Sequence, residues 1–459
     1  MAEQKLEIPA ASYLPPESAF GVKCHRATFV LTLNSSCLKT PCVQNICYYV
    51  SIRNRSYLGS QSMSQSTNFP TVYIASAART PVGGFQGALS ELPAPRLGAI
   101  AIKEAVARAG VKPESIDEVI MGNVLTAGIG QAPARQALIY AGLPTSVPAL
   151  TINKVCGSGL KAVMLAADGI RLGRSQIAVA GGQENMTLAP HLLQKSRNGF
   201  RMGDTQLVDS MVHDGLWDPY NNFHMGVAAE LCVKENSFTR EEQDAFAIGS
   251  YKKAQHAQAE GLFKKEIVAV EVASRKGTVK VEADEDVTKT DFAKIPGLKP
   301  AFEKTGTITA ANASKINDGA AAVVLMSEDA VKAGGAKPLA KIIGQAHHAH
   351  DPKWFTTAPA GAMVKAVKNA GLEMNQIDLF EINEAFAAVT MVGMKELKIA
   401  AEKVNVHGGA VAIGHPIGAS GARILSTLVY ALHTHNKRYG LATLCIGGGE
   451  AVAVVIEKV

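Results

Sequence analysis

Two cysteines and one histidine lie in glycine-containing turns, and loops of this kind often carry functional side chains. Cys156 lies in the run Asn-Lys-Val-Cys-Gly-Ser-Gly, His415 in the run Gly-His-Pro, and Cys445 in the run Cys-Ile-Gly-Gly-Gly. A fourth run, Asn-Glu-Ala-Phe, begins at Asn383. A thiol with an imidazole as its base is suited to nucleophilic catalysis through a covalent intermediate. We therefore expect covalent acyl chemistry.

Cys156 is predicted to stand where a strand turns into a helix. The positive end of a helix and its free N–H groups lower the pKa of a nearby thiol, which favours a nucleophile. The alternative is a small buried hydrophobe, the usual state of an isolated cysteine. The helix is indicated by apolar residues at helical spacing, namely Leu160, Val163, Met164, Ala167 and Ile170.

The other candidates have complementary chemistry. His415, held in a glycine and proline turn, is placed to act as a base towards a thiol. Cys445 ends an apolar strand, and a second thiol there can remove a proton from the carbon beside a thioester carbonyl. Asn383 could hold a water or donate to an oxyanion, whereas Glu384 either begins a helix or orients its neighbours. The alternatives are a structural histidine and a core cysteine, and nothing requires a second imidazole at His407.

A long internal repeat indicates the architecture that positions these residues. The run Ala-Val-Ala-Arg-Ala-Gly at 105–110, followed by Ile-Asp at 116–117, has an echo at 366–371 and 377–378. Ser-Gly at 158–159 likewise has an echo at 420–421. Such a period is far too long for a solenoid, and apolar strands without alternation are typical of sheets covered by helices on both faces. The sequence predicts a duplicated α/β fold.

The domain boundaries follow from changes in pattern. We expect an N-terminal half at 71–333, a C-terminal half at 336–459, and a loop domain inserted in the first half at about 187–312. The insert breaks regular periodicity, except for a helix near 239–261 that opens with the capping box Thr-Arg-Glu-Glu at Thr239.

Residues 1–70 form a disordered leader or extension in our interpretation. They are rich in Ser, Asn and Cys and have no acidic residue after Glu17, as in a mitochondrial import peptide. Glu3, Glu7 and Glu17 argue against import, and Met63 could begin a cytoplasmic form. Mitochondrial import is the expectation, with a cytoplasmic protein as the alternative.

Composition excludes several classes. A net charge of +6 on 459 residues, with no basic cluster interleaved with aromatics, gives no support for a nucleic-acid partner. No apolar run is long enough to span a bilayer, so no membrane role is expected. Four of the seven cysteines lie in the first fifty residues without zinc spacing, and the other three look like single thiols in a reducing compartment.

From about residue 72 to the C-terminus the chain resembles the thiolase family, because its four motifs occur in that family's order. The resemblance implies a duplicated thiolase fold of alternating helix and sheet layers, and a homotetramer. It implies that His415 activates Cys156 to take an acetyl group from acetyl-CoA, and that Cys445 deprotonates a second acetyl-CoA to give acetoacetyl-CoA and CoA. One oxyanion hole is implied from His415 and an Asn383-held water, the other from the amides of Cys156 and Gly447.

The resemblance also implies ligand contacts. Coenzyme A is a substrate rather than a prosthetic group, and His224 and Tyr220 look like the short-chain branch. A potassium site is implied at Tyr220, Ala310, Ala311, Ala313 and Val411, although Ile446 and Glu450 depart from the mitochondrial relatives. Implied coenzyme A contacts are Tyr220, His224, Met225, Lys289, Lys294, Ala310, Ser314, Ala385 and Phe386.

Two other functions fit the same residues. A degradative 3-ketoacyl-CoA thiolase of broader chain length uses the same four catalytic positions. A lipid-binding or scaffold protein on an inactive thiolase fold is the third possibility, and the four intact motifs speak against it.

Overall fold

The computed structural model describes residues 22–25, 28–31, 70–275 and 277–459. Contacts divide the chain into one unit at Met1–Thr67 and a second at Asn68–Val459. Most of the predicted leader lies outside the described residues. Within it, β1 (Val22–His25) and β2 (Thr28–Leu31) pair as an antiparallel hairpin. All the remaining helices and strands of the described residues lie in the second unit.

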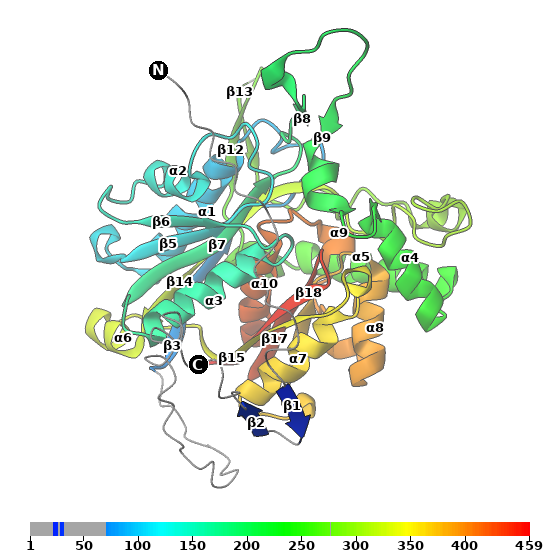
Figure 1. The fold of residues 1–459 in the computed structure, drawn as a ribbon. Coiled ribbons are helices and arrows are strands. Elements are labelled where there is room, and N and C mark those ends of the chain that lie inside the picture. The colour runs from blue at the N-terminus through cyan, green and yellow to red at the C-terminus, as the bar shows by residue number, and fades with distance from the viewer. Residues whose placement is uncertain (1–21, 26–27, 32–69, 276) are drawn as a thin grey trace, which may run out of the picture. The chain divides into compact units, whose positions relative to one another are not determined.

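The first half of this unit contains a five-stranded mixed sheet in the order β3-β14-β7-β5-β6 (Figure 1). Strand β14 is antiparallel to its neighbours, whereas β7, β5 and β6 run parallel. A short strand, β4 (Gly83–Gly84), pairs with the start of β14. The main strands are β3 (Val72–Arg79), β5 (Glu118–Gly122), β6 (Ala149–Ile152), β7 (Ile177–Asn185) and β14 (Asn317–Ser327).

The second half repeats this pattern with four strands in the order β16-β17-β18-β15. Strands β16 and β17 are parallel and the other pairs are antiparallel. Strand β15 also pairs with β3 over three residues, from Ala340 opposite Ile74 to Ile342 opposite Val72, so the two sheets are continuous. The bounds are β15 (Ala340–Ala349), β16 (Leu379–Ile382), β17 (Tyr439–Ile446) and β18 (Glu450–Lys458).

Helices and sheets alternate in layers (Figure 1). Helices α1 (Ala94–Ala109) and α2 (Pro133–Tyr140) cover one face of the first sheet. Helices α3 (Ser158–Arg171) and α10 (Ser420–Thr434) lie between the halves and share one apolar core with both sheets. Helix α7 (Ala358–Asn369) covers the outer face of the second sheet, with α8 (Ala387–Leu397) beside it. The expected duplicated α/β fold is confirmed.

The repeat seen in the sequence has the same hydrogen bonds in both halves. Asp117 ends the first echo, and its carboxylate accepts from the amides of Gln176 and Ile177 at the start of β7. Asp378 ends the second, and its carboxylate accepts from the amides of Arg438 and Tyr439 at the start of β17. An aspartate thus connects corresponding strands in each copy.

The two central helices cross at glycines. A Cβ on Gly159 would lie 2.8 Å from the Ala422 amide nitrogen, and one on Gly421 would lie 2.2 Å from the Leu160 amide nitrogen. Only glycine allows two helix backbones to approach this closely. The crossing fixes the starts of α3 and α10, which follow Cys156 and His415 in the chain.

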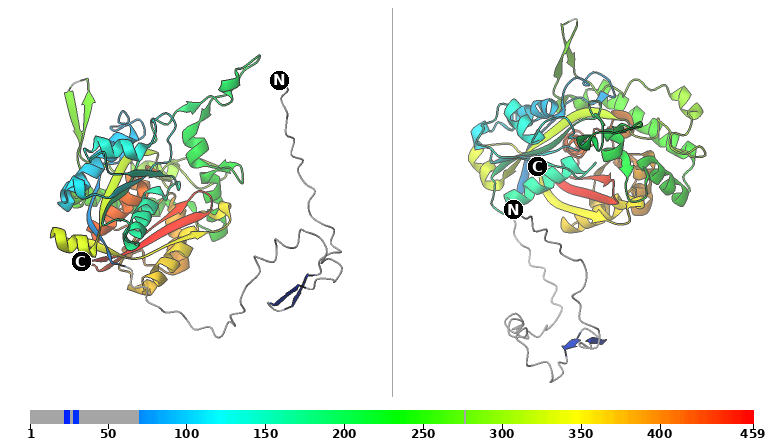
Figure 2. Two further views of the ribbon diagram at one scale, coloured as in Figure 1. Left: turned by 60° about the vertical axis from the view of Figure 1, so that its left-hand side comes forward. Right: turned by 45° about the horizontal axis from the view of Figure 1, so that its top comes forward.

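The segment between β7 and β14 forms the predicted loop region. Its helices are α4 (Met225–Asn236) and α5 (Arg240–Ala259), and the expected capping box at Thr239 and Glu242 is confirmed. The hairpin of β12 (Val270–Ser274) and β13 (Gly277–Val281) projects from the layers in both views of Figure 2. Two further hairpins are β8 (His191–Leu192) with β9 (Val208–Asp209), and β10 (Trp217–Asp218) with β11 (Phe223–His224).

Short elements complete the chain. Helix α6 (Glu328–Gly334) connects the halves, and α9 (Ala410–Ile413) precedes His415. Within the described residues, no helix is long and apolar enough to cross a membrane. Short helical turns occupy Pro113–Ser115, Ser196–Asn198, Met211–Leu216, Leu262–Lys265, Phe292–Gly297, Pro352–Trp354, Met374–Gln376 and Ala401–Lys403.

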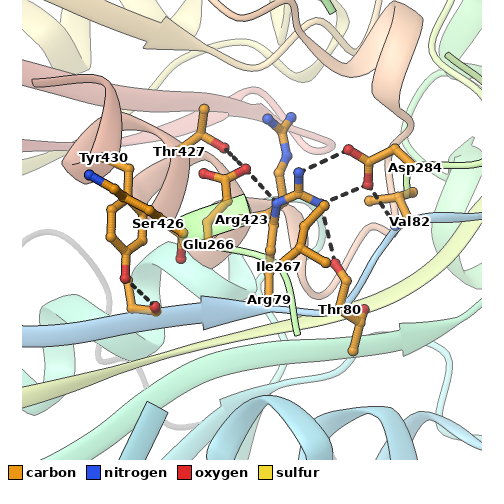
Figure 3. Close-up of polar contacts among 12 residues, drawn as sticks. Arg79, Thr80, Val82, Glu266, Ile267, Asp284, Arg423, Ser426, Thr427 and Tyr430 are labelled. Carbon is orange, nitrogen blue, oxygen red and sulfur yellow. Dashed lines mark hydrogen bonds and ion pairs between the residues drawn. The ribbon is translucent and has the colours of Figure 1, made fainter. Parts of the chain in front are cut away.

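A buried ion cluster joins the first half, the loop region and α10 (Figure 3). Arg79 at the end of β3 contacts Glu266 at 2.7 Å and Asp284 at 2.7 and 2.9 Å. Thr427 of α10 donates to Glu266 at 3.2 Å. Arg423 of α10 lies beside the cluster (Figure 3). Because these carboxylates are buried, they depend on Arg79 for compensation of their charge.

Candidate active site

A cavity of about 190 Å³ lies where the loop region meets the turns that carry the predicted catalytic residues. Cys156, His415 and Gly447 lie on its wall, although they come from three separate turns. The remaining wall is mostly apolar. It is formed by Met186, Gly215, Leu216, His224, Met225, Phe302, Ala313, Ser314, Lys315, Ile316, Phe355, Ala385, Phe386 and Ile417.

Cys156 stands directly before α3, as predicted. Val155 adopts a left-handed φ of 45°, which turns the chain sharply before the helix begins at Ser158. The amides of Gly447 and of Cys156 itself lie within hydrogen-bonding reach of the sulfur and lower its pKa. Burial outweighs them, however, and raises the pKa of the thiol to about 11. The predicted net lowering of this pKa was therefore wrong, and Cys156 rests as a thiol.

His415 is held by one nitrogen and free at the other. Its Nδ1 lies 2.6 Å from the Ser420 hydroxyl, which itself donates to the Pro416 carbonyl at 2.9 Å. With its single hydrogen used in this way, the hydroxyl accepts from Nδ1–H, which leaves Nε2 as an unprotonated base. Nε2 is buried and has no protein partner among the described residues. Burial, and then the charge of Arg423, lower the pKa of His415 to about 3, so the imidazole is neutral.

Asn383 and Glu384 follow β16 and are both buried. The Asn383 amide nitrogen lies 3.4 Å from His415 Nδ1, and the Asn383 amide oxygen has no partner among the described residues. Glu384 accepts hydrogen bonds from Ser250, Asn405 and the Val411 amide. These contacts make Glu384 an orienter of its neighbours, the second of the two roles considered for it.

Cys445 is buried at the end of β17. Burial, and then the charge of Cys156, raise the pKa of Cys445 well above its usual value. Cys445 is not part of the cavity wall, but it belongs to one apolar cluster with the wall residues Met225, Ala313, Phe355, Ala385 and Phe386. In the described part of the chain the three cysteines are free thiols. His407 is buried 3.1 Å from His435 and is not part of the cavity wall.

Comparison with known proteins identifies this arrangement. Residues 72–329 match the family description "Thiolase, N-terminal domain", and residues 336–458 match "Thiolase, C-terminal domain". The chain belongs to the thiolase family.

Individual thiolases resemble it over nearly their whole length. An acetyl-CoA acetyltransferase of Cupriavidus necator is 57% identical over 84% of this chain and 99% of its own. A cytosolic acetyl-CoA acetyltransferase of Gibberella zeae is 53% identical over 85% and 99%. The crystal structure of Acat5 thiolase from Ascaris suum in complex with coenzyme A is 46% identical, with a TM-score of 0.81 over 85% of this chain and 100% of that one.

The structure brings several expected coenzyme A contacts of the thiolase into one wall. His224, Met225, Ser314, Ala385 and Phe386 all line the cavity. His224 stacks on Phe302 with 4.8 Å between ring centroids, and its Nδ1 accepts from the Gly226 amide. This contact fixes the ring at the start of α4.

Other expected contacts lie outside that wall. Lys289 pairs with Glu285 at 2.7 Å, and Lys294 pairs with Asp291 at 3.3 Å, each within its own turn. Both lysines are exposed, and Ala310 is exposed as well. Local ion pairing explains why the two lysines lie outside the wall, because each has a carboxylate three or four residues away in the sequence. Their role at the mouth of the site stays a prediction.

The predicted potassium residues differ in their surroundings. Ala311, Ala313 and Val411 are buried, whereas Tyr220 is 73% exposed. Carbonyl and hydroxyl oxygens are suitable ligands for a hard cation, but the exposure of Tyr220 means that its hydroxyl faces solvent.

Some wall residues were missed by sequence reasoning. Phe302, Phe355 and Leu216 carried no motif, and only the fold brings them to the cavity. Lys315 directly follows the predicted run 310–314 and lies 5.0 Å from the ring centroid of Tyr251, so its position in the sequence was the available signal.

Proposed function

We propose that this thiolase is an acetyl-CoA C-acetyltransferase, which reversibly converts two acetyl-CoA to acetoacetyl-CoA and CoA. One observation carries the proposal: Cys156, His415 and Gly447 line one apolar cavity, and Cys445 packs in one cluster with other residues of the same wall. Relatives named acetyl-CoA acetyltransferases, at 50–57% identity, support it.

The first half-reaction transfers an acetyl group to Cys156. Nε2 of His415 takes the thiol proton while the sulfur attacks the acetyl carbonyl, because the resting thiol is not ionised at neutral pH. The C–S bond to coenzyme A then breaks, and CoA leaves as a thiol with the proton that His415 took. Acetyl-Cys156, a neutral imidazole and the Cys445 thiol remain, so protons and charges balance.

The second half-reaction forms the carbon–carbon bond. Cys445 passes its proton to His415, and the resulting thiolate removes a methyl proton from a second acetyl-CoA. The carbanion then attacks acetyl-Cys156. Cys156 leaves as a thiolate and recovers its proton from His415. In this proposal the amides of Gly447 and Cys156 stabilise one oxyanion, and His415 with an Asn383-held water stabilises the other. No prosthetic group enters this sequence.

A steady-state assay tests the function. Thiolysis of acetoacetyl-CoA and the reverse condensation should both proceed, and a medium-chain 3-ketoacyl-CoA should react more slowly. Equal or faster turnover of the medium chain would favour the broader degradative thiolase. Failure to turn over any 3-ketoacyl-CoA would favour a binding or scaffold protein.

The potassium site is a separate proposal, and a comparison of two salts tests it. The carbonyls of Ala310, Ala311, Ala313 and Val411, with Tyr220, would supply neutral oxygen ligands. If potassium binds there, activity in potassium chloride exceeds activity in sodium chloride at the same ionic strength. Equal activity in the two salts argues against the site.

A homotetramer and mitochondrial import are also proposals. Leu150 on the edge strand β6 and Ile139 and Tyr140 on α2 are large apolar side chains that are 44–48% exposed, which supports self-association. Light scattering should give four times the mass of the chain. A fusion of residues 1–70 to a fluorescent protein tests import, and a diffuse cytoplasmic signal would favour the alternative.

A further inference from the structure

Glu184 is a fully buried carboxylate that the reaction sequence above does not use. It lies near the end of β7, two residues before Met186 of the cavity wall. Burial raises the pKa of Glu184 to about 7, against the effect of its hydrogen-bond donors. Burying a carboxylate costs free energy unless hydrogen bonds or an opposite charge compensate for the lost solvation.

Its two oxygens receive four hydrogen bonds from two different loops. Oε1 accepts from Asn123 Nδ2 at 2.7 Å and from the Leu125 amide at 3.2 Å. Oε2 accepts from the Val124 amide at 3.0 Å and from the Gly418 amide at 2.9 Å. A single oxygen therefore joins the loop after β5 to the loop that carries His415.

The joined loops are packed without spare room. A Cβ on Gly418 would lie 2.6 Å from Glu184 Oε2 and 3.0 Å from the Cα of Asn123. A Cβ on Gly182 of β7 would lie 2.0 Å from the Gly418 carbonyl oxygen. The backbone that follows His415 thus rests directly on β7, and the carboxylate fixes it there.

The two loops that Glu184 joins also pack against the nucleophile Cys156. Leu125 and Ile417, each next to a group bound by Glu184, belong to one apolar cluster, and Cys156 packs against that cluster. A shift of either loop would change the separation between the base and the sulfur. Misplacement by about 1 Å in an active site can lower a rate by about 10²-fold.

We propose that Glu184 is a positioning residue that holds the His415 loop in register with Cys156 for acetyl transfer. This inference rests on the proposed function, because it assumes that His415 and Cys156 carry the first half-reaction. The chemical steps assigned to Cys156, His415, Cys445, Asn383 and Gly447 do not involve Glu184.

The charge of Glu184 provides a second, separable effect. It disfavours the Cys156 thiolate and so raises the pKa of the thiol, among the smaller of the causes that act on it. Among the described residues, the wall that holds Cys156 also carries the titratable groups of His415, His224 and Lys315, and Cys445 packs against residues of the same wall. Removal of the charge should therefore make the free thiol easier to alkylate at a given pH, even while enzymatic acetylation slows.

Two variants separate the effect of the side-chain length of Glu184 from the effect of its charge. Glu184→Asp keeps the charge but is one methylene too short to contact both loops. Glu184→Gln keeps the length but places an NH₂ group among four N–H donors. Glu118→Gln is the matched control, because Glu118 accepts from Ser175 and lies on β5 at the end remote from the site.

The experiment is single-turnover acetylation of Cys156 by acetyl-CoA, followed by quenching and mass spectrometry, together with alkylation of Cys156 by iodoacetamide across pH. We expect acetylation to slow by about 10²-fold in both Glu184 variants, with half-saturation by acetyl-CoA unchanged. The pH at which Cys156 is alkylated at a given rate should be lower than in the wild type only in Glu184→Gln. Glu118→Gln should match the wild type in both measurements.

The outcomes are distinguishable. Wild-type acetylation rates in either folded Glu184 variant would overturn the positioning role. If one variant fails to fold, the other decides the question alone. If the wild-type protein itself forms no acetyl adduct on Cys156, the proposed function fails first.

Discussion

Ser420 Oγ lies 2.6 Å from His415 Nδ1, and the hydroxyl donates its own hydrogen to the Pro416 carbonyl. The first residue of α10 thereby fixes both the tautomer and the orientation of the candidate base. Nε2 stays free, on a residue that lines the cavity.

Ser420→Ala should therefore slow acetylation of Cys156 while leaving the fold intact. With the acceptor gone, the imidazole is free to rotate or to change tautomer, and we expect a loss of about 10- to 10²-fold. Rapid-quench mass spectrometry measures it. Ser426→Ala is the control, because Ser426 is buried on the same helix and, among the described residues, its hydroxyl donates to the Ala422 carbonyl alone. Equal rates in the two variants would refute the role of Ser420.

Alkylation of free Cys156 should increase steadily with pH. Burial raises its pKa to about 11, so the thiolate fraction grows about tenfold per pH unit over the range 7 to 10. Peptide mapping after brief treatment with iodoacetamide gives the rate at each pH. A plateau below pH 8 would show instead that the helix and the turn amides outweigh burial.

Removal of Arg79 should destabilise the protein strongly. Arg79→Met leaves Glu266 and Asp284 buried without their cation, which costs about 3–5 kcal/mol. A large drop in the denaturation midpoint is expected. Arg438→Met is the comparison, because Arg438 pairs with Glu457 at the surface and its loss should change the midpoint little. Similar drops in both variants would contradict the account of the cluster.

Gly421→Ala should weaken the crossing of the central helices. The new Cβ would lie 2.2 Å from the Leu160 amide nitrogen, so the helices must separate at a cost of about 1–3 kcal/mol. A Cβ on Gly249 in α5 would meet no atom of the described residues within 4 Å apart from the backbone of its own helix, so Gly249→Ala should be neutral or stabilising. Thermal denaturation distinguishes them. An unchanged midpoint in Gly421→Ala would mean that the crossing tolerates a wider separation.

Local and periodic features were predictable from the sequence. The echoes around 105–117 and 366–378 indicated the duplicated fold, and Thr239 with Glu242 marked the start of a helix. The turn before α3 at Cys156 also follows from the apolar spacing after it.

Properties that depend on distant segments were not predictable in this way. The resting pKa of Cys156 is set by burial, which its neighbours in sequence do not report. Glu184 receives its hydrogen bonds from residues about 60 and 234 positions away, so no local pattern marks it. Lys289 and Lys294 looked available for an anionic ligand, but nearby carboxylates pair with both.

The most direct test of the central claim is to locate the acetyl group after mixing with acetyl-CoA alone. Intact-mass and peptide measurements should show one acetyl adduct on Cys156 in the wild type and in Cys445→Ala, and none in Cys156→Ala. Cys445→Ala should form no acetoacetyl-CoA, because the second proton transfer is lost. Equal loss of the adduct in both variants, or an adduct that survives in Cys156→Ala, would contradict the division of labour between the two thiols.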